Sequence, residues 1–211
     1  MPLITVMRHG DRMDEDPAAV IARIFDCPLS AEGVNRALNT KIPGVKKTIA
    51  SPMLRCVHTA VLSSGIHSFG DGVSTFNPGK ITVDNRLCEV WNRRVLRAPI
   101  DTVTLLTKEE YQQAMGLQTE LILSDHPLPS AEESRGSGGT ADDRFLAAIQ
   151  AIAAENSDFD HILLVTHGDA VSSMANLLGR SVYETNYCSF ITAEFNGTWN
   201  FVSSNGVGFL S

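Results

Sequence analysis

The segment at residues 161–166 constrains the fold more than any other part of the chain. Its sequence, HILLVT, is a nearly continuous apolar run, which is typical of a strand buried on both faces of a sheet. A second apolar run at residues 3–7 predicts another such strand, and shorter strands are predicted at residues 48–50 and 81–84. Helical segments separate these strands, so the sequence predicts an α/β fold with an open sheet.

Signals for helix ends place the helices between the strands. Ser30 is a candidate N-cap, and Ser51 with Pro52 predicts a helix that begins at these two residues. Thr107 and Glu110 form a capping-box pattern at the start of another helix. Helices are therefore expected after Ser30 and at residues 18–25, 51–65, 107–116, 140–156 and 168–179.

Two other segments have different signals. Residues 65–79 are rich in Gly, Ser and Asn and are expected to form a loop. Asn196-Gly197 separates two apolar segments, 189–195 and 198–203, and this pattern predicts a β-hairpin. We expect the hairpin to form an antiparallel edge of the sheet, away from the chemistry.

Composition limits the kinds of partner. The 211 residues are expected to form one domain, residues 1–211, with an insert at about 92–130. A formal net charge of −7 argues against a nucleic-acid partner. No apolar run approaches the ~20 residues of a membrane span and no signal peptide is visible, so we expect a cytoplasmic protein without membrane association. The four cysteines are far apart and are expected to be reduced.

Candidate functional residues follow the two apolar strands. The first strand leads into Arg8, His9 and Arg12, and the strand at residues 161–166 leads into His167. Ligands of open α/β sheets bind beyond the carboxyl ends of the strands, so these side chains are expected at one site. Guanidinium groups match phosphate oxygens, and a neutral histidine nitrogen can act as a nucleophile.

The two shorter strands add further candidates. Arg55 falls in the first turn of the helix that follows residues 48–50, and Glu89 comes soon after residues 81–84, beside Trp91. A carboxyl group beside an aromatic ring is suited to general acid catalysis. Three arginines follow and are expected either to pair with neighbouring acids or to form a rim that recognises a second acidic group on a substrate: Arg93, Arg94 and Arg97.

Together these residues form a set suited to phosphoryl transfer. A transferring phosphoryl group spreads its negative charge over three oxygens, which the arginines and a protonated His167 could surround. A neutral ring nitrogen of His9 could attack phosphorus, while Glu89 protonates the leaving oxygen and later activates water.

Four short motifs occur in a fixed order: RHG at residues 8–10, SPMLRCVHTA at 51–60, EVW at 89–91 and THG at 166–168. They resemble the motifs of the histidine phosphatase superfamily, also called phosphoglycerate mutase-like. The resemblance implies a three-layer sandwich with a mostly parallel six-stranded sheet, helices on both faces and an antiparallel edge. It also implies a phosphorylated His9, a proton donor at Glu89, no metal and no cofactor, with the phosphate pocket completed by Arg8, Arg55 and His167.

Arg12 and the Glu-x-Trp pattern narrow the resemblance to one branch. That branch holds ecdysteroid-phosphate phosphatase and the phosphatase domains of the suppressor-of-T-cell-receptor-signalling proteins. The resemblance implies that Arg12 also faces the phosphate, and it leaves a homodimer open. Mutases of the superfamily usually carry Glu-Ser after Arg-His-Gly, whereas this chain has Asp11-Arg12 and is short, which disfavours a mutase.

The sequence therefore predicts a phosphatase that hydrolyses phosphate monoesters, with a phosphorylated small molecule or a phosphopeptide as substrate. A phosphoglycerate mutase-type phosphotransferase and a non-enzymatic phosphate-binding interaction module are the alternatives. Metal-dependent hydrolysis by His9, His167 and a carboxylate is a further alternative, but the chain lacks an H-x-x-x-H or H-x-H ligand pattern for these residues.

Overall fold

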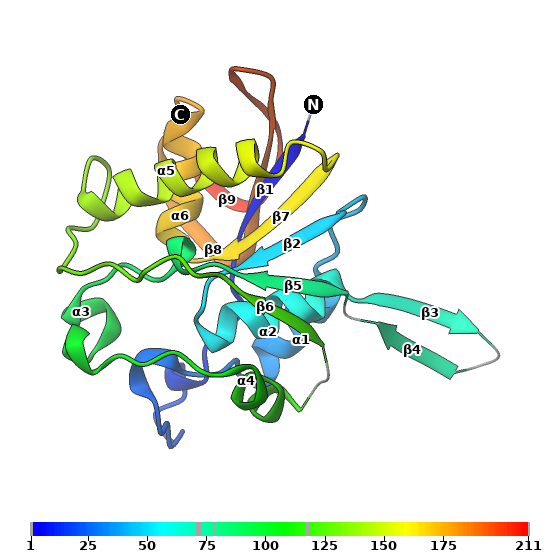
Figure 1. Cartoon of the computed structure of the whole chain (residues 1–211), viewed down its shortest axis with the longest axis vertical. Coiled ribbons are helices and arrows are strands. Elements are labelled where there is room, and N and C mark those ends of the chain that lie inside the picture. Colours follow the sequence, from blue (N-terminus) through cyan, green and yellow to red (C-terminus); the bar gives the residue numbers. More distant parts are fainter. Residues whose placement is uncertain (1, 71–72, 78, 117–118, 211) are drawn as a thin grey trace.

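The computed structural model describes residues 2–70, 73–77, 79–116 and 119–210 (Figure 1). A seven-stranded sheet lies at its centre. Its strands are β1 (Leu3–Arg8), β2 (Lys47–Ala50), β5 (Lys80–Val83), β6 (Glu120–Leu123), β7 (His161–Thr166), β8 (Val182–Phe195) and β9 (Trp199–Phe209). They are arranged in the order β6-β5-β2-β7-β1-β8-β9.

Most of this sheet is parallel. The strands from β6 to β1 pair in parallel, whereas β8 pairs with β1 and with β9 in the antiparallel sense. The predicted mostly parallel sheet with an antiparallel edge is confirmed, but it has seven strands and not six. The additional strand is β6, which lies within the expected insert and is only 4 residues long, too short to give a clear pattern.

The described residues form six α-helices: α1 (Ala31–Asn39), α2 (Leu54–Ser64), α3 (Arg93–Leu96), α4 (Lys108–Met115), α5 (Thr140–Glu155) and α6 (Gly168–Leu177). Figure 1 shows α1, α2 and α4 on one face of the sheet and α5 and α6 on the other. A cluster of buried apolar side chains fills each of the two interfaces. The expected three-layer α/β sandwich is therefore confirmed.

The strand β7 contributes to both clusters. Leu163 and Val165 belong to the cluster beneath α1 and α2, whereas Ile162 and Leu164 belong to the cluster beneath α5 and α6. All six residues of the strand are buried, as the apolar run predicts. Burying each such side chain contributes roughly 1.5–3 kcal/mol, so this strand anchors both layers.

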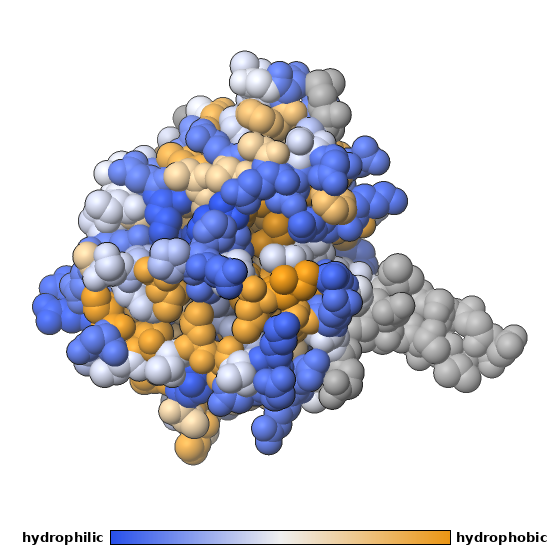
Figure 2. All heavy atoms as spheres, viewed as in Figure 1, coloured by the Kyte–Doolittle hydropathy of each residue, from blue (hydrophilic) through white to orange (hydrophobic). Residues whose placement is uncertain are grey.

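Apolar side chains are not confined to the core. Figure 2 shows a hydrophobic area on the lower half of the face drawn, below a band of hydrophilic side chains. Among the described residues, no helix is long and apolar enough to cross a membrane.

All four cysteines are free and buried, in agreement with the reduced state that was expected.

Two predicted helix caps are confirmed. The Ser30 hydroxyl accepts a hydrogen bond from the Gly33 N–H at the start of α1. At the start of α4, Thr107 and Glu110 form the full capping box, in which each side chain accepts a hydrogen bond from the backbone N–H of the other residue.

The predicted start of α2 is wrong. The helix begins at Leu54, three residues after the predicted N-cap Ser51. The Leu54 N–H is bound by a carboxylate from outside the local sequence, because Asp26 Oδ1 lies 2.6 Å from it. Ser51 is consequently free to bind another residue.

The helix expected at residues 18–25 is absent, and only a 3₁₀ turn, Ile24–Asp26, occurs there. Val20 is 96% exposed, so this segment lacks the buried apolar side that would stabilise a short helix. Within the loop expected at residues 65–79, β3 (Ile66–Gly70) and β4 (Val73–Asn77) pair as a second, two-stranded sheet. Residues 71–72 and 78 of that expected loop lie outside the described residues.

The Asn196-Gly197 hairpin is confirmed, with Phe195 paired to Trp199 across the turn. Its strands are longer than predicted, because β8 has 14 residues and β9 has 11. The expectation that the hairpin lies away from the chemistry is wrong. Cys188 of β8 donates its N–H to the His9 carbonyl oxygen, 3.1 Å away, so the start of β8 runs beside His9.

The loop after β1 is held against α1 by two glycines. A Cβ added to Gly33 would lie 2.2 Å from the Asp11 carbonyl oxygen, and one added to Gly10 would lie 2.7 Å from the Gly33 carbonyl oxygen. Both neighbours are backbone atoms, which cannot rotate away as a side chain can. This close approach fixes the segment that carries His9.

We expect Gly33→Ala to destabilise the protein by about 1–3 kcal/mol, because the added methyl overpacks a rigid contact. Helix propensity alone would give the opposite sign, a gain of about 1 kcal/mol. Urea unfolding followed by circular dichroism measures the difference. Gly79→Ala is the control, since a Cβ there meets no described atom within 4 Å. Equal stability of Gly33→Ala and the wild type would contradict the close packing.

Candidate active site

The carboxyl end of β1 places His9 at the bottom of a cavity. The side chain is only 2% exposed, and its Nδ1 lies 2.8 Å from the Gly10 carbonyl oxygen. This contact requires a proton on Nδ1, which leaves the lone pair on Nε2 free. Arg55 donates its Nε–H to that Nε2 over 3.2 Å, which fits the same tautomer. The structure thus presents a nucleophilic nitrogen beside a cation.

Glu89 follows a 3₁₀ turn (Asn85–Leu87) after β5 and contacts the same arginine as His9. Its Oε2 accepts a hydrogen bond from Arg55 Nη2 at 2.9 Å and lies 3.0 Å from His167 Nδ1. Its Oε1 accepts the Val90 N–H at 3.0 Å. Every contact favours the ionised carboxylate.

His167 stands between β7 and α6 and is 1% exposed. Its ring centroid lies 5.4 Å from that of His9. Because its Nδ1 faces Glu89, its Nε2 is left to Ser51, whose Oγ is 2.8 Å away. Ser51 therefore binds a site histidine and does not cap α2 as the sequence predicted.

Burial and mutual charge set the protonation states of these three groups. Burial, with the Arg55 and His167 charges, holds the pKa of His9 well below its usual value. Burial raises the pKa of Glu89, but His167 and Arg55 outweigh it and the net pKa lies well below the usual value. Burial also lowers the pKa of His167, although Glu89 opposes the change. Burial therefore disfavours the protonated His167 that was expected from the sequence, whereas the contact with Glu89 favours it.

Arg8 is oriented by the hairpin. Its Nη1 donates to the Thr185 carbonyl oxygen at 2.5 Å, and its Cζ lies 3.8 Å from the ring centroid of Tyr187. The Tyr187 ring is also 5.6 Å from that of His9, and its hydroxyl donates to Glu15. Tyr187 lies within an irregular part of β8, between Thr185 and Phe190, in which Cys188 has a φ of 56°. Such irregularities redirect side chains near active sites.

The Glu89 loop is fixed from the opposite layer by Arg144 of α5. Its guanidinium donates to the carbonyl oxygens of Arg86, Cys88 and Glu89, at 2.7, 3.1 and 3.2 Å. Glu133 neutralises this arginine over 2.6 and 2.8 Å. Three hydrogen bonds from one guanidinium to this loop leave Glu89 little freedom to move.

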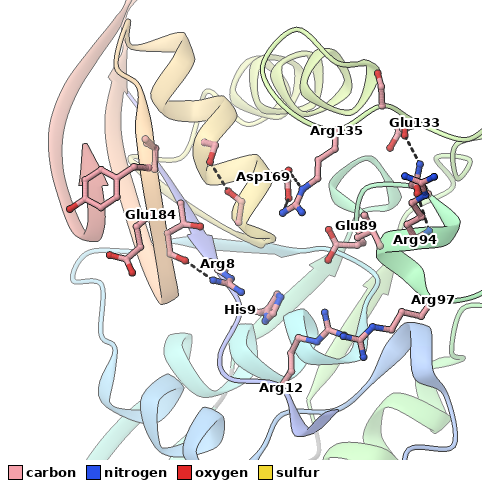
Figure 3. A pocket seen from close by; sticks show the side chains of 18 residues that line it. Arg8, His9, Arg12, Glu89, Arg94, Arg97, Glu133, Arg135, Asp169 and Glu184 are labelled. Carbon is pink, nitrogen blue, oxygen red and sulfur yellow. Dashed lines mark hydrogen bonds and ion pairs between the residues drawn. The ribbon is translucent and has the colours of Figure 1, made fainter. Parts of the chain in front are cut away.

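Arg12 and Arg97 share one carboxylate. Asp14 Oδ2 lies 2.6 Å from Arg12 Nη2 and 3.0 Å from Arg97 Nη1. Figure 3 shows the two guanidinium groups converging from opposite sides, Arg12 from the loop after β1 and Arg97 from the end of α3. The single negative charge of Asp14 therefore balances only one of the two positive charges.

A cavity of about 770 Å³ opens above His9 (Figure 3). Arg8, His9, Arg12 and Glu89 line it, and Arg55 and His167 lie buried directly behind them. Of the three arginines expected at the rim, Arg94 and Arg97 also line the cavity. Arg93 does not, and its Nε lies 3.6 Å from a carboxylate oxygen of Glu132.

Sequence reasoning missed several residues that shape this site. Ser51 was assigned to a helix cap, and Tyr187 was not considered, because it lies two residues before the segment 189–195 of the hairpin that was expected away from the chemistry. Arg135 also lines the cavity, where it forms two hydrogen bonds of 2.7 and 2.9 Å with Asp169. Asp169 follows directly after the THG motif, which is the only sequence signal that could have drawn attention to this pair.

Ligand atoms of His9, Glu89 and His167 all lie within 4.8 Å of one another, a spacing that could hold a metal ion. Arg55, however, donates to both His9 and Glu89 from the same side. Its guanidinium stays protonated and repels a cation at this point. The surroundings of the three residues suit an anion better than a metal ion.

Residues 4–200 match the sequence profile of the histidine phosphatase superfamily (branch 1). The chain belongs to this superfamily. No curated protein sequence matches it at a significant level.

Solved structures share the superfamily fold. The ecdysone phosphate phosphatase of Bombix mori is 20% identical, with a TM-score of 0.65 over 96% of this chain and 92% of the other. A phosphoserine phosphatase of Entamoeba histolytica is 16% identical, with a TM-score of 0.55 over 97% of both chains. A phosphoglycerate mutase of Thermus thermophilus is 18% identical, with a TM-score of 0.52 over 95% and 99%. At these identities, the likeness establishes a common fold.

We expect Ser51→Ala to destabilise the protein by about 1–3 kcal/mol, because it leaves the buried Nε2 of His167 with only a long contact to Cys56 Sγ, 3.7 Å away. Ser63→Ala is the matched control: that serine is also buried, but its hydroxyl only donates to the Thr59 carbonyl oxygen within α2. Its expected effect is below about 0.5 kcal/mol. Chemical unfolding compares the two, and equal losses would show that the contact with His167 contributes nothing.

Proposed function

We propose that this protein is a phosphomonoesterase that works through a phosphohistidine at His9. One observation carries the proposal: the unprotonated Nε2 of His9 lies at the bottom of an arginine-lined cavity, 3.2 Å from Arg55 Nε. A buried neutral imidazole beside fixed cations is suited to attack a phosphoryl group that those cations hold.

The first step forms a bond between His9 Nε2 and phosphorus and breaks the bond from phosphorus to the leaving oxygen. Glu89 gives its proton to that oxygen and releases an alcohol. In the second step, water attacks the phosphohistidine, Glu89 takes the proton from the water, and phosphate leaves with His9 restored. Water is the only co-reactant that these two steps need, so the proposed reaction requires no cofactor.

Glu89 must acquire a proton before it can act as an acid. In the free protein it is the counterion of Arg55, which keeps it ionised. A phosphate dianion bound beside Arg55 competes for that guanidinium and adds negative charge near the carboxylate. Both effects raise the pKa of Glu89. Binding of the substrate therefore prepares the acid that the first step requires.

The remaining residues hold the phosphate. Arg8, Arg12 and Arg55 supply donors from three directions, and His167 adds a ring nitrogen once the phosphate displaces Glu89. We assign catalytic roles to His9, Glu89 and His167, and phosphate binding to the three arginines. The substrate is a phosphorylated small molecule or a phosphopeptide.

The structural relatives support hydrolysis of monoesters. Two are called phosphatases, of ecdysone phosphate and of phosphoserine, and the first was solved with tungstate, an oxyanion with the shape of phosphate. A phosphoglycerate mutase has the same fold, so transfer to a second acceptor is the competing function. Phosphorylation and hydrolysis assays on the wild type and on His9→Ala distinguish hydrolysis from transfer.

We expect His9→Ala to abolish hydrolysis of p-nitrophenyl phosphate in the presence of EDTA, while wild type keeps its activity as the pH falls below 6.5. The nucleophile remains neutral there because burial and Arg55 hold the pKa of His9 well below 6.5. His126→Ala, at an exposed histidine outside the cavity, is the control. Loss of wild-type activity with EDTA would favour a metal enzyme. If His9 becomes phosphorylated but no ester is hydrolysed, a mutase is favoured. If neither phosphorylation nor hydrolysis is detected, a binding module is favoured.

We expect Glu89→Gln to slow hydrolysis of phenyl phosphate at least about 100-fold, the usual contribution of a general acid. The loss with p-nitrophenyl phosphate should be much smaller, since nitrophenolate leaves without protonation. Glu132→Gln is the control, because this exposed carboxylate pairs with Arg93 outside the cavity. Steady-state kcat for both substrates decides the matter: equal losses would remove Glu89 from the acid role.

A further inference from the structure

The cavity extends well beyond the phosphate-binding residues. Its volume of about 770 Å³ is in the range of pockets for whole small molecules. One wall carries Arg94 and Arg97, both from the α3 segment, next to Arg12. Figure 3 shows Glu184 on the other side of the cavity from Arg97. The part of a substrate that remains after the phosphate is placed would therefore meet arginines on one side.

Most acidic side chains of the lining are already neutralised. Glu133 is bound by Arg144, Asp169 by Arg135 and Glu89 by Arg55. The arginines of the wall, in contrast, have fewer carboxylate partners than positive charges. Arg12 and Arg97 share Asp14, and within the described chain no carboxylate lies in salt-bridge distance of Arg94. The wall formed by α3 thus has a surplus of positive charge.

Arg97 also has an unusual backbone conformation. It ends α3 with φ 55° and ψ 28°, in the left-handed region that helix ends normally give to glycine or asparagine. Arginine is unfavourable in this conformation, and strained backbone of this kind occurs most often at functional sites. The conformation directs the long side chain across the cavity mouth toward Arg12 (Figure 3).

The lining offers little to an apolar leaving group. Val95, Val182 and Tyr183 are its large apolar or aromatic side chains, and charged or polar residues form most of the rest. A rigid hydrocarbon body would bury guanidinium and carboxylate groups without hydrogen-bond partners, which is costly. A polar leaving group with its own negative charge can instead form ion pairs with the arginines of this wall.

Resting on the proposed function, we propose that the substrate is a small phosphomonoester with a second anionic group, a carboxylate or a phosphate, bound by Arg94 and Arg97. The reactive phosphate lies over His9, and the second group lies at the wall formed by α3. Arg12, which faces both places, links the two subsites.

Matched substrates test this assignment. The first pair is 4-carboxyphenyl phosphate and its neutral amide, 4-carbamoylphenyl phosphate, and the second is 1,4-phenylene bisphosphate and phenyl phosphate. We expect wild-type kcat/KM to favour the charged member of at least one pair by about fivefold, the size of a partly exposed charge contact. The pair with the larger ratio identifies the second group as a carboxylate or a phosphate.

Three variants assign the preference to residues. Arg97→Gly, which also relieves the left-handed backbone, and Arg94→Gln should each bring the charged-to-neutral ratio close to one. Arg93→Gln is the matched control: it removes an arginine of the same helix that pairs with Glu132 outside the cavity, and it should keep the wild-type ratio. Because each ratio is measured within one variant, a general loss of stability does not mimic the effect.

The outcomes separate this inference from the proposed function. Hydrolysis of p-nitrophenyl phosphate with a ratio of one for both pairs would overturn the second subsite and leave the phosphatase intact. A preference that survives both Arg97→Gly and Arg94→Gln would also overturn it. If wild type hydrolyses none of these esters, the proposed function fails, and the second subsite fails with it.

Discussion

The buried guanidinium of Arg55 is the interaction on which the rest of the site depends. It is 1% exposed, and an arginine so deeply buried is tolerable only with close counterions and filled hydrogen bonds. Glu89 meets it at 2.9 Å and Asp26 at 4.0 Å, while His9 accepts its Nε–H. Through these contacts one side chain of α2 ties together the segments that follow β1 and β5. The positions of His9 and Glu89 follow from the need to supply one buried cation with a hydrogen-bond acceptor and a counterion.

In the proposed reaction, Glu89 has two tasks that require opposite protonation states. As counterion of Arg55 it must be ionised, and as general acid it must carry a proton. A bound phosphate resolves the conflict, because it can replace Glu89 as counterion while its own charge makes protonation of the carboxylate easier. Arg144 holds the backbone of the loop in either state, so only a proton has to move.

Local signals allowed much of the fold to be predicted. The apolar run of β7 identified a strand buried on both faces, and the caps at Ser30 and Thr107 were correct because each bond closes within four residues. The failures at the site involve partners far away in sequence. Ser51 binds His167, which is 116 positions later in the sequence. Asp26 accepts the hydrogen bond from the Leu54 N–H at the start of α2, although it lies 28 positions earlier. Tyr187 reaches the site through an irregular part of β8, which no alternation pattern reveals.

The floor and the wall of the cavity differ in how firmly they can select a ligand. At the floor, His9, Arg55 and His167 are almost fully buried, so their interactions with a phosphoryl group are strong and poorly screened by salt. At the wall, the Arg97 side chain is 54% exposed, and such contacts are each worth about 1 kcal/mol or less. In the proposed reaction, the floor therefore decides whether a phosphoryl group is transferred. The proposed second subsite at the wall only ranks leaving groups, and its preference becomes smaller as ionic strength rises.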